Sequence, residues 1–116
     1  MVLRLAEQYL IRAEARAQQS NIEGAESDLD LIRSRAGLMN VTADTKDSLL
    51  SEIQHERQVE LFCEWGQRWC DLKRSRLADV ILGERKKPNW QSSDSLYPLP
   101  ANEILRNPVL MQNPGY

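Results

Sequence analysis

Three glutamates spaced by four residues, Glu56, Glu60 and Glu64, are the side chains in this sequence that most clearly could do chemistry. On an α-helix this spacing places successive carboxylates on one face, about 6 Å apart. Two carboxyl groups about 5–10 Å apart can serve as the acid and the base or nucleophile of glycoside hydrolysis. Glu56 and Glu60 therefore define one hypothesis, a small glycosidase. The spacing is unspecific, because any helix with glutamates at positions i and i+4 satisfies it.

A structural interpretation fits the same residues better. Like charges four residues apart on a helix repel each other, so a sequence that keeps them is expected to supply cations. We predict a network of guanidinium–carboxylate pairs that locks two helices together at a bend near Gly66. The predicted members are Glu56, Arg57, Glu60, Glu64, Arg68, Asp71 and Arg74. We expect Arg57 or Arg68 to lie within salt-bridge distance of at least one of the three glutamates.

Other catalytic arrangements lack support in the sequence. His55 is the only histidine, and on one helix it would lie about 12 Å from Cys63, beyond hydrogen-bond reach. The chain has no serine nucleophile elbow, glycine-rich phosphate loop or metal-binding spacing of cysteines and histidines. We therefore predict no catalytic residue, metal or cofactor. Cys63 and Cys70 would be about 10.5 Å apart along a continuous helix, too far for a disulfide, and are predicted to be buried thiols.

The aromatic residues offer one candidate for ligand contact. A flat ring with a polar tip suits a sugar ring, and Trp90 follows Pro88 in a polar loop, so it is the candidate platform. Trp65 and Trp69 have the i, i+4 spacing of a packed pair on a helix, and we predict that both are packing residues.

Composition limits the class of protein. The chain has 116 residues, 41% of them hydrophobic, and a formal net charge of −2 with both signs interspersed. This describes an ordinary globular chain of one domain's length, without the basic surface that nucleic acid requires. No apolar run approaches the roughly 20 residues needed to span a bilayer, and the N-terminus lacks a signal-peptide pattern.

Hydrophobic periodicity predicts an all-α fold that begins with a helical hairpin. Apolar residues recur at three- and four-residue steps over 2–19 and again over 22–36, so both segments are expected to be amphipathic helices. Ser20 and Glu23 have the spacing of a capping box for the second helix, and Gly37 is placed to end it. The pair is about as long as one tetratricopeptide repeat, and such a hairpin needs partners against which to stack.

Two further helices and an irregular tail are expected to follow. A third helix is predicted at 45–64, capped by Asp44 or Thr42, and a fourth at 67–75, with a possible continuation to Gly83. Prolines at 88, 98, 100, 108 and 114 make the tail, 87–116, mostly irregular, apart from a short helix near 101–105 and a type II turn at 113–116. The tail is too apolar for a free linker, so we expect it to pack along the helices.

Three segments together resemble the C-terminal region of the SusD/RagB family. The first comprises Arg4-Leu-Ala-Glu-Gln-Tyr-Leu-Ile-Arg-Ala-Glu-Ala15 and Ile32-Arg-Ser-Arg-Ala-Gly37. The second, Glu56-Arg-Gln-Val-Glu-Leu-Phe-Cys-Glu-Trp-Gly-Gln-Arg-Trp-Cys-Asp-Leu-Lys-Arg74, is similar to the family signature E-R-x-x-E-L-x-x-E-G-x-R-x-x-D-L-x-R. The third is Tyr97-Pro-Leu-Pro100 with Asn107-Pro108 and Gln112-Asn-Pro-Gly-Tyr116. The sequence departs from the pattern at Trp65, inserted between Glu64 and Gly66, and at Leu99, where isoleucine is common.

The resemblance implies tetratricopeptide-like helix pairs in a protein that captures glycan or peptide without enzymatic activity. It also implies a lipid anchor in the outer membrane of Bacteroidetes, through an N-terminal portion absent from this chain, and a TonB-dependent SusC-like transporter as partner. We expect residues 1–116 to serve mainly as scaffold of such a protein, so no ligand-binding residue is carried over. The alternative is a free-standing tetratricopeptide-like adaptor that binds a peptide in its concave face.

Overall fold

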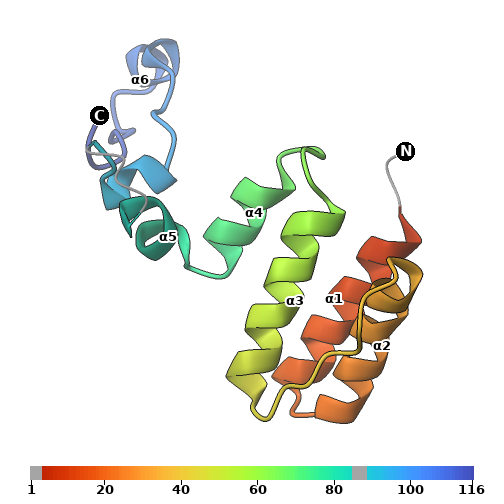
Figure 1. Ribbon diagram of the computed structural model, residues 1–116. Coiled ribbons are helices and arrows are strands. Elements are labelled where there is room, and N and C mark those ends of the chain that lie inside the picture. The colour runs from red at the N-terminus through yellow and green to blue at the C-terminus, as the bar shows by residue number, and fades with distance from the viewer. Residues whose placement is uncertain (1–3, 85–88) are drawn as a thin grey trace. The chain divides into compact units, whose positions relative to one another are not determined.

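The computed structural model describes residues 4–84 and 89–116, and over these ranges every regular element is a helix (Figure 1). The predicted all-α class is thereby confirmed. The expected helix start at residue 2 and tail start at residue 87 lie outside the described residues. Contacts divide the chain into two compact units, 1–68 and 69–116, which are described separately. Within the described ranges, no helix has the length and apolar character needed to cross a membrane.

The first unit contains α1 (Leu5–Gln18), α2 (Ile22–Arg35) and α3 (Lys46–Glu60), with α1 in contact with both of the others (Figure 1). Its core collects the apolar stripes of all three helices, and the stripe of α1 is rich in alanine, which lets neighbouring helices approach closely. The buried cluster consists of Ala6, Leu10, Ala13, Ala17, Ala25, Leu29, Ile32, Ala43, Leu49 and Ile53. The predicted hairpin is therefore present, with α3 as a third helix against it.

The cap of α2 differs from the prediction. Ser20 has a φ of 63°, and the amide of Asn21 donates to the carbonyl of Arg16, so Ser20 belongs to the turn that ends α1. The N-cap of α2 is Asn21, whose side chain accepts a hydrogen bond from the Gly24 amide at 3.0 Å. The Ser20–Glu23 capping box was therefore wrong, because a left-handed residue completes the end of α1 there.

Gly37 ends the α2 segment as predicted. It has a φ of 74°, and the Leu38 amide that follows it donates to the Arg33 carbonyl at 2.9 Å. This is the left-handed glycine termination that the sequence indicated, and it satisfies a carbonyl that the end of the helix would otherwise leave unpaired.

The third helix is shorter than predicted at its C-terminus. Its N-cap is Thr45, which accepts from the Ser48 amide at 3.1 Å, in place of Asp44 or Thr42. It ends at Glu60, four residues before the predicted end, because Cys63 and Trp65 take left-handed φ angles of 57° and 43° ahead of Gly66 at 70°. A helix cannot continue through such residues.

This early end overturns two expectations that assumed a continuous helix. Cys63 and Cys70 are both free and exposed, so the prediction of buried thiols was wrong. Trp65 is 76% exposed, so its predicted role as a packing residue was also wrong. Between Glu60 and Gln67 the backbone is a series of turns, so 3.6-residue periodicity does not say which side chains face the core there.

The second unit consists of short elements. The predicted helix 67–75 is present as α4 (Gln67–Arg74), whose first two residues, Gln67 and Arg68, belong to the first unit. Its continuation to Gly83 was wrong, because Arg76 takes a φ of 59° and a separate helix, α5 (Ala78–Glu84), follows. The tail contains a 3₁₀ helix, η1 (Ser92–Ser95), which contacts α5, and the predicted short helix, α6 (Ala101–Arg106).

The end of the tail folds back on the segment before α6. The Gln112 side chain accepts from the Leu99 amide at 2.7 Å and donates to the Leu99 carbonyl at 3.0 Å. The side-chain amide of Asn113 donates to the Tyr97 carbonyl, and the Tyr116 hydroxyl donates to the Leu96 carbonyl. Gly115 has a φ of 94°, as the predicted type II turn requires. The segments around Tyr97-Pro-Leu-Pro100 and Gln112-Asn-Pro-Gly-Tyr116 are therefore two halves of one arrangement.

Candidate functional site

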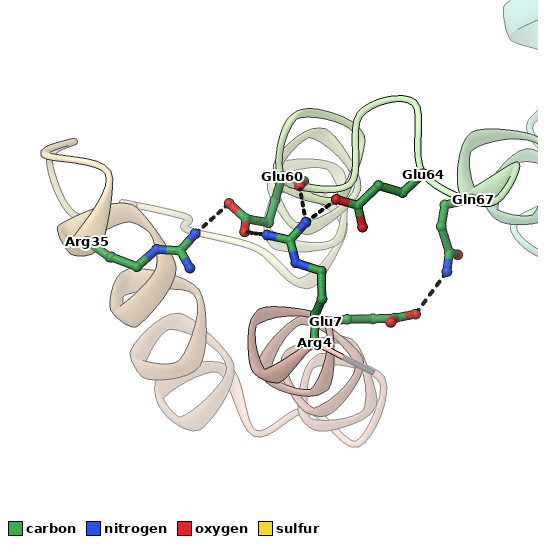
Figure 2. A network of polar contacts seen from close by, with 6 residues as sticks. All are labelled: Arg4, Glu7, Arg35, Glu60, Glu64 and Gln67. Atoms are coloured by element: carbon green, nitrogen blue, oxygen red, sulfur yellow. Dashed lines mark hydrogen bonds and ion pairs between the residues drawn. The ribbon is translucent and has the colours of Figure 1, made fainter. Parts of the chain in front are cut away.

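A network of charged side chains joins the start of α1 to the end of α3 (Figure 2). The guanidinium of Arg4 donates to the Glu60 carbonyl at 3.1 Å and pairs with the carboxylates of Glu60 and Glu64. Arg35, at the end of α2, pairs with the other carboxylate oxygen of Glu60 at 2.6 Å. Glu60 thus connects all three helices of the first unit through two arginines.

The C-terminal end of α3 favours a positively charged hydrogen-bond donor such as Arg4. Helix α3 ends with carbonyls that lack a partner within the helix, and the negative end of its dipole favours a cation. Arg4 supplies both a donor to the Glu60 carbonyl and the positive charge. The side chains of Arg4 and Glu60 are only 26% and 12% exposed, so their attraction is screened less than that of a surface pair.

The network also reaches the turn that follows α3. Glu64, bound by Arg4, lies between the two left-handed residues Cys63 and Trp65. Gln67, at the start of α4, donates to the Glu7 carboxylate of α1 at 3.0 Å (Figure 2). Non-glycine residues in the left-handed region are strained, and they persist only where surrounding contacts hold them. The contacts of Glu64 and Gln67 hold both ends of this strained turn against α1.

Two further buried carboxylates are held by arginines in the first unit. Glu56 is 4% exposed and lies 3.2 Å from Arg33, whose Nε also donates to the Met39 carbonyl. Asp28 is 1% exposed, and both of its oxygens accept bonds from Arg12, at 2.6 and 2.8 Å. Arg16 adds a bond to Asp28 at 2.8 Å. Hydrogen bonding to Asp28 raises the pKa of the Arg12 guanidinium above its ordinary value.

The residues predicted for the ion network are only partly accounted for. Glu56, Glu60 and Glu64 are all paired with arginines, namely Arg33, Arg4 and Arg35, which the sequence interpretation missed. Arg57 is buried in α3 and Arg68 is half-buried in α4; their pairing with the glutamates stays a prediction. The missed arginines lie at helix ends, Arg4 before α1 and Arg33 and Arg35 in the last turn of α2, within the segments that resemble the SusD/RagB family.

In the second unit, Asp71 is 6% exposed and accepts from Arg74 at 3.1 Å within α4. This pair belongs to the predicted set, yet it lies in a different unit from the three glutamates. The arginine pairs of the three glutamates lie within the first unit, and the pair of Asp71 and Arg74 lies within the second.

The candidate platform, Trp90, lies in an aromatic cluster of the second unit. It is half-buried, and its ring meets Trp69 edge to face at a centroid distance of 6.2 Å. Trp69 makes a similar contact with Tyr97 at 6.5 Å, and the Lys73 ammonium lies over both Trp69 and Tyr97. The cluster combines edge-to-face and cation–π attraction.

Asp79 holds the Trp90 indole in this cluster. Its carboxylate accepts from the Ser92 hydroxyl at 2.5 Å and from the Trp90 indole N–H at 2.9 Å. Both bonds favour the charged carboxylate, so the pKa of Asp79 lies below its ordinary value, with the Ser92 bond as the larger cause. Among the described residues, no group of three histidine, cysteine or acidic side chains is arranged to hold a metal ion.

Comparison of the sequence with known proteins identifies its relatives. The model of the SusD family (SusD_RagB) matches residues 1–89. The chain is 37% identical to SusD-like protein P2 of Formosa agariphila, over 98% of this chain and 25% of that protein. It is 32% identical to the starch-binding protein SusD of Bacteroides thetaiotaomicron, over 99% of this chain and 21% of that protein.

A solved structure agrees with the sequence comparison. A SusD-like protein from Bacteroides fragilis superposes with a TM-score of 0.83 and 32% identity, over 98% of this chain and 25% of that one. The chain thus spans about a quarter of the length of the relatives that it matches. With a family match over three quarters of its residues and the same helical architecture, the chain belongs to the SusD family.

Proposed function

We propose that this chain is the scaffold region of an outer-membrane protein that captures glycan and delivers it to a SusC-like TonB-dependent transporter. The observation that carries the proposal is the SusD family match over residues 1–89, together with 32% identity to the starch-binding protein SusD over nearly the whole chain. In this proposal, a lipid anchor outside residues 1–116 holds the protein at the membrane. The captured ligand is an oligosaccharide, with a peptide as the other class.

The contacts of the polar side chains support a scaffold role for these residues. Both oxygens of Glu60 and both oxygens of Asp28 accept bonds from arginines that tie helices together. The Trp90 indole N–H, which a sugar hydroxyl could otherwise use, donates to Asp79. Groups already engaged in this way contribute to rigidity more than to ligand recognition, which requires polar groups that converge on an open concave site.

The same contacts speak against a glycosidase built on Glu56 and Glu60. Glu56 is buried, and the carboxylate of Glu60 lies between two guanidinium groups. A catalytic acid or nucleophile must reach the glycosidic bond. We expect no hydrolysis of oligosaccharides by the chain above the level of a Glu60→Gln variant. Hydrolysis that this variant abolishes would contradict the binding proposal.

Calorimetric titration with a panel of oligosaccharides tests the scaffold role. The 116-residue chain is expected to bind with a Kd weaker than about 1 mM, unchanged by Trp90→Ala, because one half-buried ring is a poor site. The starch-binding protein SusD serves as the positive control for starch oligosaccharides. Tight binding by the chain, lost in Trp90→Ala, would place the ligand site here and contradict the scaffold role.

One feature favours the alternative, a peptide-binding adaptor. A cavity of about 350 Å³ opens on α1, lined by Leu5, Gln8, Tyr9, Ile11 and Arg12. An extended or helical peptide with apolar anchors could occupy such a surface. Selection of peptides from a random library on the purified chain, followed by Leu5→Glu, separates the two functions. Micromolar binding lost in Leu5→Glu would support the adaptor, whereas the scaffold proposal expects no such peptides.

A further inference from the structure

The turn after α3 presents large apolar side chains to solvent. Phe62 and Trp65, here called the aromatic turn, are 74% and 76% exposed, and Val59, in the last turn of α3, is 57% exposed. Leu61, which directly precedes Phe62, is 3% exposed and lies in the interior. The turn thus directs one side chain inward and the two aromatic ones outward. Together the two residues expose about 300 Å² of largely apolar surface.

The aromatic turn is fixed in place by its strain and its ties. Trp65 takes a φ of 43°, which is costly for a bulky residue, and Cys63 takes 57°. Arg4 binds Glu60 before the turn and Glu64 within it (Figure 2). The backbone amide of Gln67 donates to the Glu64 carbonyl at 2.8 Å. A surface prepared in this way binds its partner without the cost of ordering a loop.

We propose that the aromatic turn is the docking surface for the rest of a SusD-type polypeptide, the part that lies outside the quarter matched by this chain. In each matched relative, about three quarters of the protein lies outside the region that corresponds to this chain. Permanent interfaces resemble a domain core cut in two and are rich in aromatic residues, whereas transient ones are more polar. The two large exposed rings of the aromatic turn give this surface the composition of a permanent interface.

This inference rests on membership of the SusD family, which is shown, and not on the proposed capture of glycan. It therefore survives if the ligand is a peptide or if the chain binds nothing. It predicts that Phe62 and Trp65 contribute little to the chain alone and much to a complete SusD-type protein that contains it.

The thiol of Cys63 reports directly on the aromatic turn, because it is exposed within it. The test uses the 116-residue chain and a chimera in which the chain replaces the matched quarter of SusD-like protein P2, every other cysteine being changed to serine. In the chain alone, we expect the thiol to react with a maleimide within about threefold of its rate in urea. In the chimera, we expect a rate lower by about tenfold or more, because the turn is covered.

Paired variants link the protection to the aromatic residues. Phe62→Gln with Trp65→Gln is expected to restore rapid labelling of the chimera and to lower its Tm by about 5 °C or more, while shifting the Tm of the chain alone by about 1 °C or less. Val109→Gln with Met111→Gln, two residues 86% exposed in the other unit, is the matched control and should leave labelling of Cys63 unchanged in both proteins.

Three results would overturn the proposal. The first is equal labelling of Cys63 in the chain and the chimera. The second is a chimera that fails to fold where P2 itself folds, because the surface would then not fit its occupant. The third is protection that appears only when a SusC-like barrel is added, which would make the transporter the occupant.

Discussion

Each of the two units of this chain is stabilised internally by a different kind of interaction. In the first, three helices of 14 or 15 residues close on a continuous apolar core, and arginines bind the carboxylates left at its edge. In the second, the helices have eight residues or fewer, and the buried residues among those that the structure describes are Asp71, Leu72 and Ala78. Hydrogen bonds from side chains to the backbone and contacts between aromatic rings replace the core there. Periodic burial builds the first unit, and individual polar partners build the second.

The largest loss of stability is expected from a substitution in the apolar core of the first unit. Leu29→Ala removes a fully buried side chain of α2, which should lower the free energy of unfolding by about 2–5 kcal/mol through lost burial and a cavity. The matched control is Leu31→Ala on the same helix, 50% exposed, with an expected loss within about 0.5 kcal/mol. Urea denaturation followed by helical circular dichroism measures both. Equal losses would mean that the apolar stripe does not carry the stability of this unit.

A smaller effect is expected from the arginine that joins α1 to α3. Arg4→Ala leaves Glu60 with one of its two guanidinium partners and removes a donor to the end of α3, so we expect a loss of about 2 kcal/mol. Arg106→Ala is the control, because its i, i+3 pair with Glu103 is solvent-exposed and should contribute about 0–0.5 kcal/mol. Thermal unfolding of the two variants would contradict the network if their losses were the same.

The elements that could be predicted from the sequence are those with periodic burial. Leu10, Ala13 and Ala17 recur at helical spacing and are fully buried, and Gly37 ends its helix in the left-handed conformation, as expected. The end of α3 could not be predicted, because Cys63 and Trp65 are ordinary helix residues by type and only the tertiary ties of Glu64 and Gln67 hold them in the left-handed region.

The sequence predicted the carboxylates of the candidate site but not the arginines that pair with them. The spacing of Glu56 and Glu60 identified both carboxylates as candidates. Their partners, Arg33 and Arg4, are 23 or more residues away in sequence. Spacing along one helix finds only neighbours on that helix, so arginines were sought nearby. Which distant cation meets a carboxylate depends on how the helices pack, which local patterns do not specify.

A substitution in the tail alone is expected to loosen the second unit and leave the first unchanged. At Gly115, with a φ of 94°, a Cβ atom would lie 2.6 Å from the Ser93 Oγ, so Gly115→Ala combines backbone strain with a clash. We expect the closure of the tail to lose about 1–2 kcal/mol, seen as faster hydrogen exchange of the Leu99 amide, with exchange in α1–α3 unchanged. Gly83→Ala, with open space at its Cβ position in α5, is the control and should be neutral or slightly stabilising. Faster exchange throughout α1–α3 as well would mean that the units are not independent.

The smallest expected effect is the response of the aromatic cluster to acid. The pKa of Asp79 is lower in the folded chain than the ordinary value of about 3.9, because its carboxylate accepts from Ser92 and Trp90. A lowered folded pKa means that the contribution of Asp79 to stability is complete above about pH 4 and is lost as the pH falls through the folded pKa. We therefore expect the fluorescence of Trp90 to change below about pH 4 while the helical signal of α1–α3 is still intact. Asp79→Asn keeps an acceptor but cannot titrate, so it should remove this acid transition; a transition that persists in the variant would assign it to another carboxylate.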